Sequence, residues 1–154
     1  MSILSDEITN DPKGKGYAAF LPDQPGHVVE LLNALTETAP KERIITSRGV
    51  ASVLGLIESE NFLQSLEEFS TATLAANHPL LPYQPGIKRQ IAWLSTQGLD
   101  LGDPLTRALL DTLAGVGIIT TVAATKLKDA ALKPASRAEV LGLPRIDEEM
   151  LRNR

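Results

Sequence analysis

The most informative absence in this chain of 154 residues is that of cysteine. Without cysteine there is no disulfide, thiol nucleophile, thiolate zinc site or cysteine-held iron–sulfur cluster. Histidine is scarce as well, because only His27 and His78 occur, too far apart for a recognisable metal-ligand spacing. We expect both histidines to have surface or capping roles. The G-x-S-x-G sequence of a hydrolase nucleophile elbow is also missing.

Long hydrophobic runs and an excess of positive charge are missing too. The apolar stretch 109–122 is interrupted by Asp111, three threonines and two glycines, so it falls short of a membrane span. The start MSILSDEITND carries acids where a secretory signal would need a basic start and an apolar run. A formal charge of −4 and a pI of about 5.2 disfavour nucleic-acid binding through an overall positive field. We therefore expect no membrane anchor and no export signal.

The densest group of acids contains Glu58, Glu60, Glu67 and Glu68, which alternate with apolar positions. A carboxylate pair for general acid–base catalysis needs environments that separate two pKa values, usually through burial. The spacing of these glutamates instead predicts the solvated face of an amphipathic helix. We predict that the chain is not an enzyme and needs no cofactor or metal. A deep pocket converging on a histidine would favour an enzyme instead.

Apolar residues at helical spacing predict an all-α fold. We expect a compact bundle of about seven to nine short helices with a proline-rich central turn at residues 78–86. Only the pair Ile44–Ile45 is expected to be briefly extended. Because neither half of about 75 residues would build a comfortable core alone, we predict a single helical domain over residues 1–154. The expected helices cover residues 2–10, about 25–38, a short one from 47, 59–77, 85–97, 104–115, 120–133, 136–142 and a last one from 147.

Several helix starts carry a side chain that can accept a hydrogen bond from a backbone amide. Asp103 gives the strongest signal, because proline follows it at the first helical position. Ser136 begins a capping box of the form S-x-x-E. The buried helix faces are expected to include Leu35, Ile57 and Val122. The expected N-caps in chain order are Asp23, Ser47, Asp103, Thr120 or Thr121, Ser136 and Asp147.

The loop 11–17, Asp-Pro-Lys-Gly-Lys-Gly-Tyr, allows two interpretations. Its lysines and glycines could bring ammonium groups and backbone amides to an anion, such as the DNA backbone or an acidic partner. It lacks the G-x-x-x-x-G-K-[ST] length and the preceding strand of a nucleotide-binding loop. The alternative is a turn whose glycines supply positive φ angles. We favour the turn and keep Lys13 and Lys15 as candidates for a contact with DNA or a partner.

Both ends of the chain resemble one protein family. The start ITNDPKGKGYAAF, followed by HVVELLNA, is similar to the "D-P-x-G-x-G-Y … L-N" opening of small proteins encoded among the virion genes of tailed bacteriophages, particularly those with long non-contractile tails. The end SRAEVLGLPRIDEEMLRNR is similar to the family's "S-R-A-E-x-L-G-L" ending and short basic last helix. The middle of the chain carries no matching motif. The segment LPDQPG departs from the plainer helix start that is usual in the family.

The resemblance implies a virion or virion-assembly protein, made in the cytoplasm of the bacterial host. It also implies that the turn 11–17, with Tyr17, docks the first helix, and that residues 136–142, with Arg137, form a capped helix. Neither motif is catalytic, so no active-site residue follows from the family. Among virion roles we favour a neck adaptor that forms a ring between the portal and the tail. A ring needs two different patches on one chain, and the charged end 145–154 could supply one.

Two alternatives stay open, namely a capsid-associated minor protein and a non-virion assembly chaperone or regulator. The expected partners are portal, neck, tail or capsid proteins, together with further copies of the chain. We expect residues 1–16 and 143–154 to be flexible or docked on a partner, because they are short, polar at their ends and weakly tied to a core. The candidate interaction residues are Lys13, Lys15, Tyr17, Arg137, Arg145, Arg152 and Arg154.

Overall fold

A computed structural model describes residues 2–154 and is mostly helical. In the described chain, 59% is helix, including nine α-helices, and 8% is strand. Two short 3-10 helices, η1 (Tyr17–Phe20) and η2 (Leu81–Tyr83), precede α2 and α5. The α-helices are α1 (Ile3–Asn10), α2 (Pro25–Asn33), α3 (Ser47–Leu54), α4 (Leu56–Thr71), α5 (Gln84–Ser95), α6 (Pro104–Gly115), α7 (Thr121–Ala130), α8 (Arg137–Val140) and α9 (Glu148–Arg152).

The prediction of a purely all-α fold needs a correction, because short strands form two two-stranded sheets. β1 (Glu37–Pro40) pairs with β4 (Leu132–Ala135), and β2 (Ile44–Ile45) runs antiparallel to β3 (Leu99–Asp100). The extended conformation expected for Ile44–Ile45 is confirmed. The helix expected over about 25–38 ends earlier, at Asn33, because the chain straightens there to enter β1.

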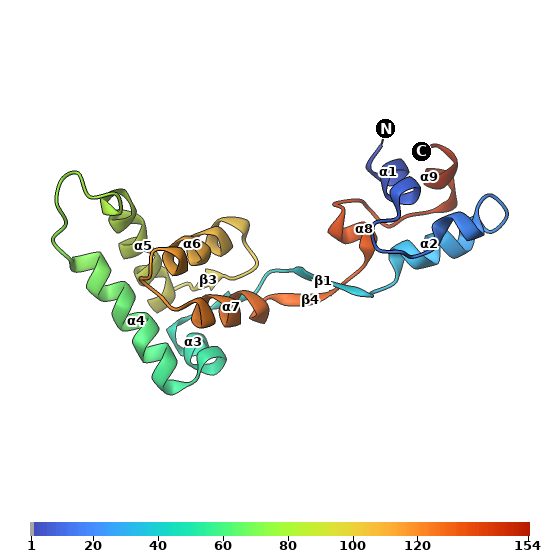
Figure 1. Cartoon of the computed structure of the whole chain (residues 1–154). Helices are drawn as coiled ribbons and strands as arrows, with labels where there is room; N and C mark the ends of the chain where they lie inside the picture. The colour runs from blue at the N-terminus through green and yellow to red at the C-terminus, as the bar shows by residue number, and fades with distance from the viewer. Residues whose placement is uncertain (1) are drawn as a thin grey trace. The chain divides into compact units, whose positions relative to one another are not determined.

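The contacts divide the described residues into two compact units, where we expected a single domain over residues 1–154. Unit 1 contains residues 2–39 and 133–154, and unit 2 contains residues 40–132. The chain passes from one unit to the other in β1 and returns in β4, so unit 2 is inserted within unit 1 (Figure 1). The proline-rich turn 78–86 therefore lies inside unit 2.

Unit 2 has an apolar core built from α3 to α7. α4 packs on α3 and α5, and α7 packs on α3 and α6. Each helix turns one apolar stripe inward, as its spacing predicts. The buried side chains of this core include Phe62, Leu66, Ile87, Leu94 and Leu127.

Unit 1 draws both ends of the chain into one smaller core. α2 packs on η1, α8 and α9, and α1 packs on η1. The Asn33 amide group donates to the Ile146 carbonyl at 2.8 Å and accepts from the Ile146 amide at 2.9 Å, which ties the segment before α9 to α2. Leu4 and Leu151 are buried in this core, although we expected the ends to be weakly tied to a core. Ordering of the ends on docking stays a prediction.

Local hydrogen bonding decides where most helices begin. The backbone amide three residues further on donates to Asp103 at 3.0 Å, to Ser136 at 3.1 Å and to Asp147 at 2.8 Å. These three expected N-caps are confirmed. Thr120 likewise caps α7, since its hydroxyl accepts from the Ala123 amide at 3.0 Å. The prediction for Asp23 is wrong, because α2 begins after Gln24, whose side chain makes no capping bond. The prediction for Ser47 is also wrong, because Ser47 is the first residue of α3 and Thr46 precedes it.

Candidate interaction site

The loop 11–17 is a turn closed by its own aspartate. The Asp11 carboxylate accepts the backbone amides of Lys15 and Gly16, each at 2.7 Å. Asp11, Gly14 and Gly16 have positive φ angles of 39°, 62° and 78°, which glycine adopts without the strain that a Cβ adds. The amides that could have met an external anion are therefore already bound to a carboxylate.

The two lysines of this loop also have partners within unit 1. Lys13 Nζ lies 3.9 Å from Glu37 Oε1, and Lys15 Nζ donates to the Thr36 hydroxyl at 3.0 Å. Both partners lie at or just before β1. The loop is thereby held against the chain that leads into β1, which favours its interpretation as a structural turn.

Tyr17 and Arg137, from opposite ends of the sequence, meet at Glu7 in α1. Arg137 donates from Nε to Glu7 Oε1 at 2.9 Å and from Nη2 to Glu7 Oε2 at 2.8 Å, a two-pronged ion pair. The Tyr17 hydroxyl donates to Glu7 Oε1 at 3.1 Å. Only 2% of the Glu7 side chain and 10% of the Arg137 side chain are exposed. The pair is therefore shielded from water on most sides.

The electrostatics of this cluster keep it ionised. The hydrogen bonds from Arg137 lower the pKa of the Glu7 carboxyl and outweigh the opposing effect of burial. Burial raises the pKa of Tyr17, and its hydrogen bond to Glu7 raises it further. The bond to Glu7 also raises the pKa of Arg137. Glu7 is thus a carboxylate and Tyr17 a neutral donor at neutral pH.

Glu37 in β1 adds a second carboxylate to the cluster. Its Oε1 lies 3.6 Å from Arg137 Nη1. Its Oε2 is buried and has no hydrogen-bond partner within the described chain. Arg137 therefore bridges α1 and β1, and its loss would leave two carboxylates without their main cation.

The other arginine candidates lie near the C-terminus, in the second segment of unit 1, and are separate from this cluster. Arg145 is exposed and lines a hollow of about 330 Å³ together with Asn33 and Ser136. Arg152 forms an exposed ion pair with Glu148 at 3.3 Å. Arg154 donates to the backbone carbonyl of Leu151. The structure therefore does not gather the candidate residues into one patch.

A larger groove separates the start of α1 from α9, with a volume of about 520 Å³. Its lining is mixed, with the apolar side chains of Ile3, Leu143 and Met150 beside those of Asp147 and Glu149. The groove is open and of mixed polarity, as contact surfaces between proteins often are.

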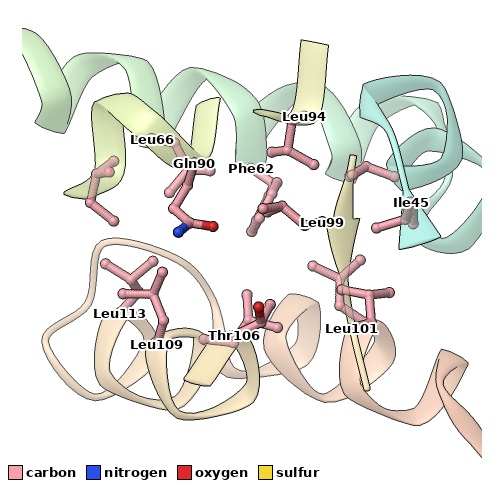
Figure 2. A pocket seen from close by; sticks show the side chains of 14 residues that line it. Ile45, Phe62, Leu66, Gln90, Leu94, Leu99, Leu101, Thr106, Leu109 and Leu113 are labelled. Atoms are coloured by element: carbon pink, nitrogen blue, oxygen red, sulfur yellow. The ribbon is translucent and has the colours of Figure 1, made fainter. Parts of the chain in front are cut away.

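A cavity also lies inside the core of unit 2, between α6 and the helices α4 and α5 (Figure 2). Its lining is apolar apart from Gln90 and Thr106, and the Gln90 amide oxygen has no partner among the described atoms. The cavity volume of about 30 Å³ corresponds to roughly one water molecule. We interpret it as a packing gap, because a ligand pocket is about ten times larger.

The histidines occupy unrelated places, His27 in the first turn of α2 and His78 in the loop before η2. The His27 ring contacts the Phe20 ring at a tilt of 51°, with ring centroids 4.1 Å apart, and the His78 Nδ1 accepts a hydrogen bond from the Leu80 amide at 3.1 Å. Within residues 2–154 no three histidine, aspartate or glutamate side chains are placed to hold a metal ion. Over the same range, no helix combines the length and apolarity needed to cross a bilayer.

Comparison with known proteins finds no matching family model, no matching curated protein and no matching solved structure. The functional proposal therefore rests on the residues of the chain itself. Sequence reasoning singled out Tyr17 and Arg137 but missed Glu7 and Glu37, which complete the cluster. Glu7 lies between the buried Leu4 and Ile8, and this position on the apolar face of α1 was the available signal.

Proposed function

We propose that this chain is a structural or assembly protein of a tailed-phage virion, specifically a neck adaptor that forms a ring by protein–protein contacts. The observation that most supports this is the meeting of the two motif-bearing ends in unit 1. Tyr17 belongs to the start motif and Arg137 to the end motif, and both bind Glu7. The segments that resemble the phage family are thus parts of one folded unit, as a shared family core would be.

The chemistry of the cluster supports a role without catalysis. Glu7, Tyr17 and Arg137 bind one another and are buried, so no free donor or acceptor among them faces a substrate. The α1–α9 groove is mixed in character and open, as contact surfaces between proteins often are. The partners that we propose are portal, neck or tail proteins and further copies of the chain. A contact with the DNA backbone is the less favoured alternative, because Asp11, Glu37 and Thr36 already bind the loop that was its candidate.

The copy number of the chain in purified virions tests this proposal. Quantitative peptide mass spectrometry against the major capsid protein should give about six or a dozen copies per particle, as a closed ring at the neck requires. Hundreds of copies would indicate a capsid or tail-tube component instead. Absence from particles, with presence in the infected cell, would contradict a virion role and favour an assembly chaperone or regulator.

A further inference from the structure

The charges of unit 2 are sorted by helix. α4 carries four glutamates and no lysine or arginine. α3 and α5 carry Arg48, Lys88 and Arg89 and no acid. Because α4 packs between α3 and α5, opposite charges sit on neighbouring helices of one unit. The sequence total of −4 conceals this separation, since the charges of unit 2 nearly cancel.

Several of these charges have no ion-pair partner. Elsewhere in unit 2, Lys126 binds Glu58 at 2.8 Å and Lys128 binds Asp111 at 2.8 Å. Four charged side chains on the exposed sides of α4 and α5, by contrast, form no ion pair. These residues of the described chain are Glu60, Glu67, Lys88 and Arg89. Both signs are thus left free, but on different helices.

The unpaired charges form two separate faces. In α4, the exposed residues Leu56, Glu60, Gln64 and Glu67 follow helical spacing and share one side, opposite the buried Phe62. We call this side the acidic face. In α5, the exposed residues Lys88, Arg89 and Ala92 lie away from the buried Ile87 and Leu94, and we call this side the basic face. One copy does not join its own two faces, because each lies on the outer side of its helix.

The acidic face also carries an apolar end. Leu56 and Ile57 are 82% and 79% exposed, although we expected Ile57 to be buried in the core. Exposed ion pairs alone contribute little to binding, whereas an apolar contact beside them removes water and adds affinity. The basic face has a suitable surface for such a contact, since Trp93 is half-buried beside it and Tyr83, just before α5, is 42% exposed.

We propose that the acidic face of one copy docks on the basic face of a second copy, with Leu56 and Ile57 packed near Trp93. A second copy fits because one chain presents both complementary surfaces. Two different surfaces on one chain form a head-to-tail interface, and such an interface closes into a ring when the rotation between copies allows it. The inference rests on the proposed function, for which it supplies the contact between neighbouring subunits.

A charge swap tests the interface. One variant combines Glu60→Lys with Glu67→Lys, and the other combines Lys88→Glu with Arg89→Glu. Each variant carries like charges on both faces, so we expect each to self-associate at least about tenfold more weakly than the wild type. An equimolar mixture should restore association, because every face then finds an opposite face on the other variant. Sedimentation velocity of the full chain at low and high salt measures these changes, with the wild type dissociating as salt rises.

Matched controls separate docking from folding and from overall charge. Asp23→Lys with Glu30→Lys makes the same change in net charge as the Glu60 and Glu67 variant, but on exposed positions of unit 1 outside the α1–α9 groove, and it should leave association unchanged. Unchanged thermal unfolding of all variants would show that the exposed substitutions preserve the fold. Trp93 is the only tryptophan, so its emission reports on the basic face and should shift on association in the wild type but not in either variant alone.

Three results would overturn the inference. These are a wild-type chain that stays monomeric at low salt and high concentration, association that survives either charge reversal, and a mixture that stays monomeric. A ring-like copy number in virions together with insensitivity to charge reversal would reject the interface and leave the proposed function standing. Charge-dependent association of a chain absent from virions would reject the function and leave the interface standing.

Discussion

The two units are stabilised by different kinds of core. Unit 2 is one continuous segment whose helices bury an apolar cluster. Unit 1 joins two segments from opposite ends of the chain, and beside its apolar core it buries the ion pair of Glu7 and Arg137, which are 130 positions apart in sequence. Removing one member of such a pair leaves an uncompensated buried charge. The pair therefore favours the fold in which the two ends of the chain pack together with Glu7 beside Arg137.

This difference predicts that the units respond to different substitutions. A polar substitution strongly destabilises an apolar core. Truncation of an apolar side chain destabilises it in proportion to the cavity that is left. A buried ion pair is sensitive to the loss of either partner even when volume is kept. Hydrogen exchange can assign each effect to one unit, because it reports local opening of each helix.

The largest expected effect follows from Arg137→Met in unit 1. This change keeps most of the side-chain volume but leaves the buried Glu7 carboxylate without its cation, so we expect a loss of about 3–5 kcal/mol. Denaturant unfolding measures the loss, and hydrogen exchange should show it in α1 and α2 with α4 unaffected. Arg152→Met is the control, because it removes only an exposed pair with Glu148 and should cost less than about 0.5 kcal/mol. Equal effects of the two substitutions would contradict the structural role of the buried pair.

A slightly smaller effect is expected for Leu127→Ala in unit 2. Leu127 is buried on α7 in the apolar core, and its truncation leaves a cavity that should cost about 2–4 kcal/mol. Exchange should accelerate in α3 and α7 rather than in α1. Val122→Ala on the same helix is a matched control, since Val122 is exposed and should matter by less than about 0.5 kcal/mol. Faster exchange in both units after Leu127→Ala would show that their cores are not independent.

Tyr17→Phe should have a moderate effect confined to unit 1. The change removes a hydroxyl that donates to an ionised carboxylate, which contributes about 1.5 kcal/mol or somewhat more. Glu7 keeps both bonds from Arg137, so unit 1 should still fold. Tyr83→Phe in unit 2 is the control, because this tyrosine is exposed and should respond by less than about 0.5 kcal/mol. A neutral Tyr17→Phe variant would argue against the hydrogen bond.

The smallest expected effect is the pH dependence of unit 1. The pKa of Glu7 is lower in the folded chain than its ordinary value of 4.5, so the unfolded state binds the proton more tightly. The stabilisation is therefore fully present above about pH 4.5 and is lost as the pH falls through the lowered folded pKa. Burial opposes the Arg137 bonds, which limits the net gain. Hydrogen exchange measured between about pH 3 and pH 7 should show this loss of stability in unit 1 of the wild type. The Glu7→Gln variant should not show it.

Local features were predictable from the sequence because they depend on neighbouring residues. Asp103, Ser136 and Asp147 each cap a helix through an amide three residues away, a distance that the sequence states directly. The error at Asp23 has a related cause. Asp23 lies in the turn that follows η1, so the last non-helical residue before α2 is Gln24 instead.

Features that need a distant partner were missed. The helix predicted over about 25–38 ends at Asn33 because β1 finds its partner in β4, about 95 residues later. Leu35 was expected to be buried and is 64% exposed for the same reason, since it lies in the link between α2 and β1. The extended pair Ile44–Ile45 was expected, but its partner β3 was not, because strands of two residues each are too short for an alternating pattern.

The sequence by itself determined the mostly helical character of this protein, the caps of four helices and the turn at residues 11–17, because backbone hydrogen bonding and helical spacing act over a few residues. Only the tertiary structure decided that the two ends form one unit, with unit 2 inserted between them, and that Glu7 joins Tyr17 to Arg137. Those contacts link residues far apart in the chain, and burial, which makes them strong, exists only after the chain has folded.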